Sequence, residues 1–272
     1  MKFQYKKPPM KRFQSYFFLF LVVVFTNSCG SGPVLFSVDQ DIQLGNQVAA
    51  EIESNPKEYP ILSESKYPKV YDYMQTIVNR IVTSPAIKYR NEFAYKDVKI
   101  IQDDKMLNAF ATPGGHIYVY TGLIKYLDTE DELAGVLGHE IAHAELRHSI
   151  KQLERQYGIS LLLQIATGQN PGALAQVATA LGQLKFSRSA ESESDAASVT
   201  YLSSSPYRCD GAAGFFKKMQ EQGGGAAPPE FLSTHPAPAN RIQAIENKAK
   251  EVGCKTTPYN PTSFDSFKKW LP

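Results

Sequence analysis

A pentapeptide in the middle of the chain, His139-Glu140-Ile141-Ala142-His143, restricts the fold more than any other stretch. It lies in a segment predicted to be helical, and an α-helix completes one turn in about 3.6 residues. His139 and His143 therefore point to the same side of the helix, where two imidazoles can hold one zinc ion. Glu140 lies beside them, within reach of a water molecule next to the metal. The alternative is a helix with two histidines in ordinary hydrogen bonds.

The composition is that of a globular protein with a substantial core. The chain has 272 residues, 43% of them hydrophobic, which is enough for one large domain or two small ones. The formal charge of +2 includes five basic residues and no acid within residues 1–28, so the rest of the chain carries a formal charge of −3. Without an excess of positive charge, we expect no binding of nucleic acid.

Residues 1–28 have the three parts of a signal peptide. A basic stretch up to Arg12 precedes an apolar run from Tyr16 to Phe25, which is about half as long as a membrane-spanning helix. Cys29 follows closely and resembles the lipidation site of bacterial lipoproteins, although Thr26 stands where leucine is usual. We therefore expect a lipid on Cys29 and a lipidated tether over residues 29–38 that holds the chain on a membrane. An uncleaved signal anchor is the alternative.

Cys209 and Cys254 are the remaining cysteines. In an oxidising compartment they can form a disulfide, whose closed loop of about 46 residues would stabilise the fold by about 4 kcal/mol in the chain-entropy model. This bond would fasten the C-terminal tail to the preceding helix. Two buried thiols are an equal alternative. A cysteine-type zinc site is not expected, because the chain has no close Cys-x-x-Cys pair.

Hydrophobic periodicity predicts two helices before the motif, over residues 39–54 and 69–83, whose apolar sides would pack into a core. Alternating and β-branched residues then predict three strands, over 93–102, 108–111 and 116–120. An exposed strand beside the motif helix could bind a peptide along its edge and hold it extended across the metal. An ordinary hairpin without that role is the alternative.

The motif helix is predicted to begin at Thr129, because Thr129 and Glu132 fit a capping box, and to continue to about Gln152. His148, five residues after His143, would then point away from the metal and be structural. Residues 153–185 are predicted to form one or two helices, broken at 168–172 and packed on the body rather than acting as a mobile lid. Their apolar part is too short to span a membrane.

A third metal ligand has to come from a later part of the chain, because a catalytic zinc site uses three protein ligands and one open position. Glu191 and Asp195 are four residues apart, so both can face the metal from one side of a helix. Spacing alone does not choose between them. Glu193 points away from that side and is expected to be solvated.

Two further helices are predicted over residues 210–222 and 238–251, followed by a tail that contains proline and serine. Between these helices, Gly223-Gly224-Gly225 and Pro228-Pro229 predict a flexible loop that ends at His235. His235 is either a group on the substrate side of the site or a residue that simply precedes the next helix.

Several motifs in a fixed order carry a family resemblance. They are Asn108-Ala109-Phe110-Ala111, Pro113-Gly114-Gly115, the motif at His139 to His143, Ser187-Arg188 with Glu191 and Asp195, and Ser233-Thr234-His235-Pro236 followed by Arg241-Ile242. The chain resembles the HtpX-like gluzincin metallopeptidases, and within them the soluble periplasmic BepA/LoiP type. The resemblance runs from about Asp39 to about Glu251. It implies a metallopeptidase domain over residues 39–252, with a C-terminal tail over 253–272.

The fold that follows is α+β and mostly helical, with a small β-sheet beside the motif helix. The resemblance implies one zinc ion per chain, bound by His139, His143 and Glu191, with Glu140 as the general base. It thereby selects Glu191 over Asp195 as the third ligand.

The resemblance also implies roles around the metal. Asp195 would orient a zinc-bound histidine through the other ring nitrogen. His235 and Arg241 would lie near the active site, where His235 contacts the metal in a closed state or stabilises the transition state. Asn108 and Ala109 would hold the substrate backbone. Ser194, where many relatives have alanine, is a departure that removes no ligand.

These features predict a zinc-dependent endopeptidase of the bacterial cell envelope that cleaves unfolded or extended polypeptides, such as misfolded envelope proteins. Its expected place is the periplasmic side, as an outer-membrane lipoprotein, since Gly30 after Cys29 is compatible with sorting to that membrane. The rival hypothesis is an assembly chaperone that binds client proteins while its peptidase site stays latched. A third is a chance motif without metal. The sequence does not indicate an oligomeric state.

Overall fold

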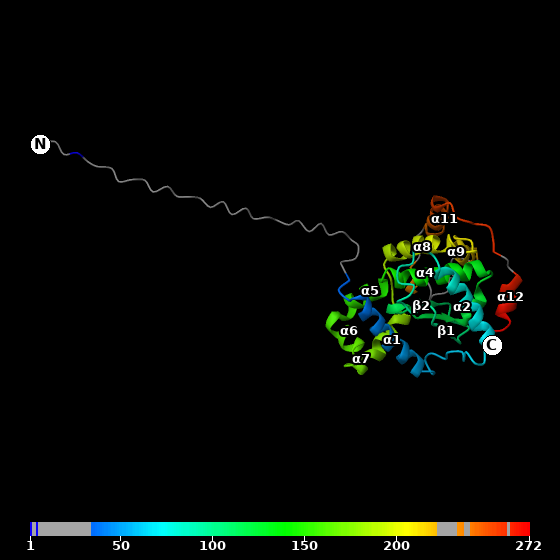
Figure 1. Cartoon of the computed structure of the whole chain (residues 1–272), viewed down its shortest axis with the longest axis horizontal. Helices are drawn as coiled ribbons and strands as arrows, with labels where there is room; N and C mark the ends of the chain where they lie inside the picture. Colours follow the sequence, from blue (N-terminus) through cyan, green and yellow to red (C-terminus); the bar gives the residue numbers. More distant parts are fainter. Residues whose placement is uncertain (2–3, 5–33, 222–232, 237–239, 260–261) are drawn as a thin grey trace. The chain divides into compact units, whose positions relative to one another are not determined.

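The computed structural model describes residues 1, 4, 34–221, 233–236, 240–259 and 262–272. The chain divides into two units, Met1–Ser31 and Gly32–Pro272, and the second contains the helices and strands described below (Figure 1). The predicted signal peptide, Cys29 and the predicted loop at 223–229 lie outside the described residues. Among the described residues, no helix has the length and apolar character needed to cross a bilayer.

A three-stranded sheet lies beside the motif helix. Its strands are β1 (Val98–Ile101), β2 (Ala109–Ala111) and β3 (Ile117–Tyr120), in the order β1-β3-β2, with β1 parallel and β2 antiparallel to β3. Between β2 and β3 the short 3-10 helix η1 (Pro113–Gly115) reverses the chain, and Gly114 has a φ of 74°, which favours glycine. Helix α3 (Thr121–Tyr126) follows β3 directly. The predicted small sheet is confirmed.

The first strand is shorter than the predicted one over residues 93–102, because pairing begins only at Val98. Residues 93–97 form turns instead. The amide of Ala94 donates to the carbonyl of Gly114 at 2.7 Å, and the hydroxyl of Tyr95 donates to Oε2 of Glu145 at 2.7 Å. The alternating apolar residues there reflect the burial of their side chains and not a strand.

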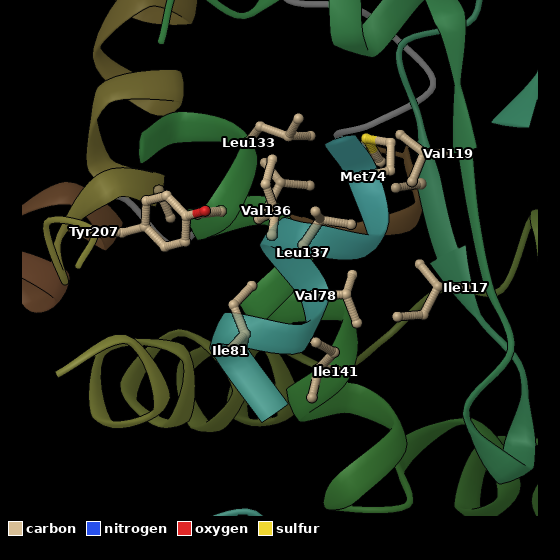
Figure 2. Packing of buried hydrophobic residues seen from close by; sticks show 14 of the residues in the cluster. Met74, Val78, Ile81, Ile117, Val119, Leu133, Val136, Leu137, Ile141 and Tyr207 are labelled. Atoms are coloured by element: carbon tan, nitrogen blue, oxygen red, sulfur yellow. The ribbon is translucent and has the colours of Figure 1, made fainter. Parts of the chain in front are cut away.

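The motif helix, α4 (Glu130–Glu145), lies at the centre of the core. Thr129 caps it as predicted, since its hydroxyl accepts a bond from the Glu132 amide at 3.2 Å. The reciprocal half of the predicted capping box is wrong, because the Glu132 carboxylate accepts from the amide of Asp128 at 2.7 Å and not from that of Thr129. The apolar side of α4 packs against α2 (Pro68–Val82). Figure 2 shows this cluster, in which α4 contributes Leu133, Val136, Leu137 and Ile141, α2 contributes Met74, Val78 and Ile81, and β3 contributes Ile117 and Val119.

Two more helices, α8 (Arg188–Leu202) and α9 (Gly211–Glu221), pack against α4. A Cβ atom on Gly135 of α4 would lie only 2.2 Å from the backbone nitrogen of Ala212, so glycine is needed for α9 to approach this closely. On α8, the hydroxyl of Ser198 donates to the Gly135 carbonyl at 3.1 Å. This close packing fixes α8, and with it Glu191 and Asp195, relative to the motif helix.

Helix α4 ends at Glu145, so the prediction that it continues to about Gln152 is wrong. Arg147 has a left-handed conformation, with φ of 59°, and a new helix, α5 (His148–Tyr157), begins after it. The guanidinium of Arg147 donates to both carboxylate oxygens of buried Asp41 at 2.6 and 2.9 Å. These bonds join the start of α1 (Val38–Ser54) to the end of α4. Helical periodicity gives no sign of such a tertiary contact.

Helices α6 (Ile159–Ala166) and α7 (Pro171–Gly182) form a hairpin that packs on α1 (Figure 1). The break predicted at 168–172 is confirmed, because the chain turns at Gly168 with φ of 73° before α7 begins. The hairpin and α1 share a second buried apolar cluster that includes Leu44, Val48, Ile52, Leu162, Ile165, Val177 and Leu181. The predicted packing of this segment is therefore confirmed.

The C-terminal residues pack onto the domain. Cys209, just before α9, forms a disulfide with Cys254, just after α11 (Arg241–Val252). A final helix, α12 (Thr262–Lys268), was not predicted, because seven residues are too few for apolar periodicity to be recognised. It buries Phe264 and Phe267, and the ring of Phe267 stacks on Tyr73 of α2 with centroids 4.2 Å apart.

Replacing both Cys209 and Cys254 by serine should lower the free energy of unfolding by about 4 kcal/mol, because the disulfide closes a loop of sequence separation 45 in the unfolded chain. Urea unfolding followed by circular dichroism measures the loss. Adding dithiothreitol should destabilise the parent chain by a similar amount and leave the double variant unchanged. Equal stability of the oxidised parent and the variant would contradict this prediction.

Candidate metal centre

Helix α4 presents two imidazoles to one point in the interior. The Nε2 atoms of His139 and His143 lie 2.9 Å apart, and both side chains are buried. Glu191 on α8 faces them: its Oε2 is 3.3 Å from Nε2 of His139 and its Oε1 is 3.3 Å from Nε2 of His143. The helix spacing places the histidines, and the packing of α8 on α4 supplies the carboxylate.

His235 is the fourth member of this group. Its Nδ1 is 3.2 Å from Oε1 of Glu191 and 3.4 Å from Nε2 of His139. One ligand atom from each of His139, His143, Glu191 and His235 lies within 4.8 Å of all the others. Three imidazoles and a carboxylate are the donor types that zinc prefers. The sequence left the place of His235 open, and the structure puts it against the other three.

Glu140 lies next to the cluster and is buried. Its Oε1 is 3.6 Å from Nε2 of His235 and makes no hydrogen bond within the described part of the chain. A buried carboxylate oxygen without a donor is costly unless a cation lies nearby. The residues present therefore fit a metal ion among these four side chains.

The surroundings shift the pKa values of several groups at the site. Burial opposes protonation of His139, but Asp195 and Glu191 outweigh it and raise the pKa of His139 to about 9, so a metal ion would have to displace a proton from this ring. Burial raises the pKa of Glu140, which moves this carboxyl toward the range of a general base at neutral pH. Burial lowers the pKa of His143 well below its usual value, so its ring is held in the neutral form that can ligate a metal. Burial opposes ionisation of Glu191, but the neighbouring His235 and His139 outweigh it and lower the pKa of Glu191.

Asp195 takes the other side of His139. Its Oδ1 is 2.9 Å from Nδ1 of His139, whereas Glu191 faces the Nε2 atoms. Arg241 donates from Nε and Nη2 to the two carboxylate oxygens of Asp195 at 2.6 and 2.8 Å. All three side chains are buried. The carboxylate of Asp195 thus lies between a cluster histidine and a fixed cation, which orients the ring.

His148 contacts the centre, contrary to the sequence interpretation that it points elsewhere. Its Nδ1 is 3.1 Å from Nδ1 of His143 and 3.2 Å from Oγ of Ser194, and its Nε2 is 3.3 Å from Oε2 of Glu193. The helix break at Arg147 turns His148 back toward α4. Glu193 is exposed at 55% of its side chain, in line with its expected solvation.

Phe186 is a second residue of the site that the sequence analysis missed. Its ring stacks on the imidazole of His143 with centroids 3.9 Å apart, and its amide donates to the carbonyl of Thr234 at 3.2 Å. Phe186 lies between α7 and α8, outside any periodic pattern. A single aromatic residue before the Ser187-Arg188 motif carried no signal of this contact.

Strand β2 is the outer strand of the sheet, but it is not exposed as expected. Ala109 has no solvent-accessible surface, and Asn108 is buried. The Asn108 side-chain amide donates to the carbonyl of Gly182 at 3.1 Å, and the hydroxyl of Thr234 donates to Oδ1 of Asn108 at 3.5 Å. The end of α7 and Thr234 therefore cover the start of β2.

Comparison with known proteins agrees with this geometry. The sequence model of peptidase family M48 matches residues 68–249, which include all four residues of the cluster. The chain belongs to peptidase family M48. The family resemblance inferred from the motifs is confirmed, and so is the mostly helical α+β fold. As a member of family M48, the chain carries a metallopeptidase domain.

Curated relatives are named as proteases. The β-barrel assembly-enhancing protease of Yersinia pestis is 29% identical over 82% of this chain and 46% of the relative. The protein of that name from Escherichia coli K12 is 28% identical over 79% of this chain and 45% of the relative. Metalloprotease YcaL of Escherichia coli K12 is 27% identical over 75% of this chain and 78% of the relative. This chain spans about half the length of the first two.

Replacing Asp195 by asparagine should weaken metal binding about 10- to 100-fold, because the variant loses the charged acceptor that orients His139 and leaves Arg241 with Glu191 as its remaining carboxylate partner, at 3.0 Å. Competition against a chromogenic zinc chelator measures the affinity. Asp265→Asn on α12 is the matched control, since Asp265 is exposed and pairs only loosely with Lys268 at 3.5 Å. Equal affinities for the two variants would show that Asp195 does not orient the ligand.

Proposed function

We propose that the chain is a zinc-dependent metalloendopeptidase of the bacterial cell envelope, with one zinc ion held by His139, His143 and Glu191. The observation that carries this proposal is the convergence of these three side chains on one buried point, with the carboxylate of Glu140 beside it. Membership of family M48 and the names of the relatives support the reaction class.

In the proposed mechanism, one proton moves from the attacking water through Glu140 to the leaving nitrogen. Zinc bound at this point would lower the pKa of a water molecule and polarise the scissile carbonyl. Glu140 would accept the proton of the attacking water and deliver it to the leaving nitrogen. The elevated pKa of Glu140, caused by burial, makes its carboxylate a better base than an exposed one. Asp195 and Arg241 would hold His139 in place throughout.

His235 would act differently in closed and open states. In the described arrangement it lies within the ligand cluster, while Phe186 covers His143. A substrate needs this space, so both side chains would have to move for cleavage. Once displaced from the ligand position, His235 would be close enough to stabilise the oxyanion of the transition state. Asn108 and Ala109 would then become available to hold the substrate backbone along β2.

We propose an unfolded or extended polypeptide as the substrate, because strand pairing along β2 requires an extended chain. Misfolded or client envelope proteins are the proposed class, in line with the name of the β-barrel assembly-enhancing relatives. A lipid on Cys29 would hold the domain on the periplasmic side of the outer membrane. The motifs at the start of the chain support the proposed anchor, and the relatives' names support the proposed substrate class.

The second candidate function is an assembly chaperone with a latched peptidase site. The covered start of β2 and the position of His235 favour it, since both block a substrate in this arrangement. Expression of Glu140→Gln in cells that lack the protein distinguishes the two functions. Rescue by this variant would support the chaperone, and failure to rescue would support proteolysis.

Glu140→Gln should retain about one zinc per chain and lose about 10²- to 10⁴-fold in the rate of cleavage of an unfolded protein such as casein, because the amide cannot accept the water proton. Metal content by mass spectrometry and a peptide-release assay measure both quantities. Glu251→Gln, on an exposed side chain of α11, is the matched control and should cleave normally. Cleavage by Glu140→Gln at the parent rate would refute the mechanism.

Glu191→Ala should lose bound zinc, because the variant removes the carboxylate ligand and leaves only neutral imidazoles at the site. Metal content of the purified protein, determined by mass spectrometry, measures the loss of zinc. Circular dichroism checks that the helices remain folded. Full zinc content in this variant would assign the third ligand to another residue, with His235 as the obvious candidate.

A further inference from the structure

A long segment of the metallopeptidase domain contains no acidic residue. The chain has 27 Asp and Glu in 272 residues, about one in ten, yet residues 155–190 have none. The segment carries three basic residues, Arg155, Lys185 and Arg188, and between the first two there is no charge at all. This segment comprises the end of α5, the hairpin of α6 and α7, and the start of α8.

The same segment leaves apolar side chains partly uncovered. The second buried cluster has half-buried apolar residues around it, and most of those come from this part of the fold: Val34, Tyr157, Ile159, Leu161, Leu163, Ala173 and Leu174. Leu35, next to Val34, is 66% exposed. The exposed positions between them on the hairpin are uncharged, for example Ser160, Gln164, Ala175 and Gln176. The three basic residues of the segment, Arg155, Lys185 and Arg188, are exposed, so an anion in the solvent can reach them.

The chain arrives from Cys29 at this same place. The amides of Leu35 and Phe36 donate to Oε1 of Glu154 on α5 at 3.0 and 2.8 Å, so the start of the domain is fastened beside α6. Four residues lie between Cys29 and Val34 in the sequence, so the two Cα atoms can be at most about 18 Å apart. A lipid on Cys29 would therefore keep α5 and the hairpin near the membrane surface.

We propose that the α6–α7 hairpin rests on an anionic lipid surface. Its half-exposed leucines and isoleucine would lie at the boundary between headgroups and acyl chains, while Arg155, Lys185 and Arg188 contact lipid phosphates. The hairpin itself adds no negative charge that the surface would repel, and the acids beside it are Glu58, 3.4 Å from the Thr179 hydroxyl, and Glu154, whose carboxylate accepts from the Leu35 and Phe36 amides. The helices are too short to cross the bilayer, so the contact is interfacial. The inference extends the proposed lipid anchor on Cys29, but the hairpin contact is measurable without it.

This orientation would place the metal centre near the membrane. The carbonyl of Gly182, at the end of α7, accepts the bond from the Asn108 side chain, and the chain then continues to Phe186 on the ring of His143. The hairpin is thus joined to the segment that covers the start of β2. A polypeptide emerging at the lipid surface would meet this part of the enzyme first.

The chain has a single tryptophan, Trp270, which allows a direct test. In the Trp270→Phe background, Leu161→Trp places a reporter on α6, and Val252→Trp places one on an exposed apolar position of α11. The protein purified from membranes is mixed with an excess of phosphatidylethanolamine–phosphatidylglycerol vesicles that carry brominated acyl chains. Bromine should quench the fluorescence of the tryptophan at position 161 strongly and leave that at position 252 unchanged.

Added acid should weaken the contact. Gln164→Glu with Gln176→Glu should raise the lipid concentration for half-maximal quenching about tenfold, because two negative charges then face an anionic surface. Gln164→Ala with Gln176→Ala is the neutral control and should behave as the parent. Circular dichroism confirms that each variant is folded.

Absence of quenching at position 161 in excess vesicles would overturn the proposal, whether or not Cys29 carries a lipid, and would leave the hairpin as a contact surface for protein. Equal quenching at positions 161 and 252 would also overturn it, since it would show contact without a preferred face.

Adding Glu140→Gln separates this inference from the proposed function. Unchanged quenching is expected in that variant, and a failure of the cleavage assay would not affect it.

Discussion

The burial of α4 is the constraint on which the rest of the structure depends. Every residue of this helix is buried, including five carboxylates and both motif histidines, so each polar group needs a partner inside the protein. Glu130 accepts from the hydroxyl of Tyr207 at 2.9 Å, and Asp131 accepts from the amides of Arg208 and Tyr259 at 2.9 and 2.8 Å. Glu145 accepts from Tyr95 at 2.7 Å. These bonds hold distant parts of the chain against one helix. His139 and His143, between them on the helix, point toward α8.

The metal centre depends on the same packing in a second way. The two ends of α4 contact different parts of the chain. At the first turn, Asp131 accepts from the Arg208 amide in the segment before α9. Just after the last turn, Arg147 donates to Asp41 of α1. Between them, α8 approaches closely enough to place Glu191 and Asp195 on opposite nitrogens of His139. Arg241 reaches Asp195 from α11 and lies over the ring of Phe216 on α9 at 4.1 Å. The position of one ligand is therefore set by helices that are distant in sequence.

The sequence predicts the helices and strands of this fold better than the turns and the packing contacts between them. Helical spacing is sufficient to place His139 and His143 together, because it is a local property of one helix. The choice between Glu191 and Asp195 is not local, since both lie on the same side of α8 and only the packing on α4 separates them. The sequence placed His148 wrongly and gave no sign of Phe186 for a related reason. The turn at Arg147 is fixed by a pair with Asp41 more than a hundred residues earlier, and the place of Phe186 is fixed by a bond to Thr234.

The arrangement of the covering segments links access to the metal with the surface of the domain. His235, Phe186 and the bonds of Asn108 all belong to the stretches that flank α7 or precede α11, not to the helices that build the site. The covering segments are therefore separate from the two helices that carry His139, His143 and Glu191. Helix α7 is continuous with the segment that carries Phe186, so the proposed membrane contact and one cover of the site lie on one stretch of chain. In an enzyme held at a lipid surface, this connection would let the surface influence when the site opens, without any change in the ligand set.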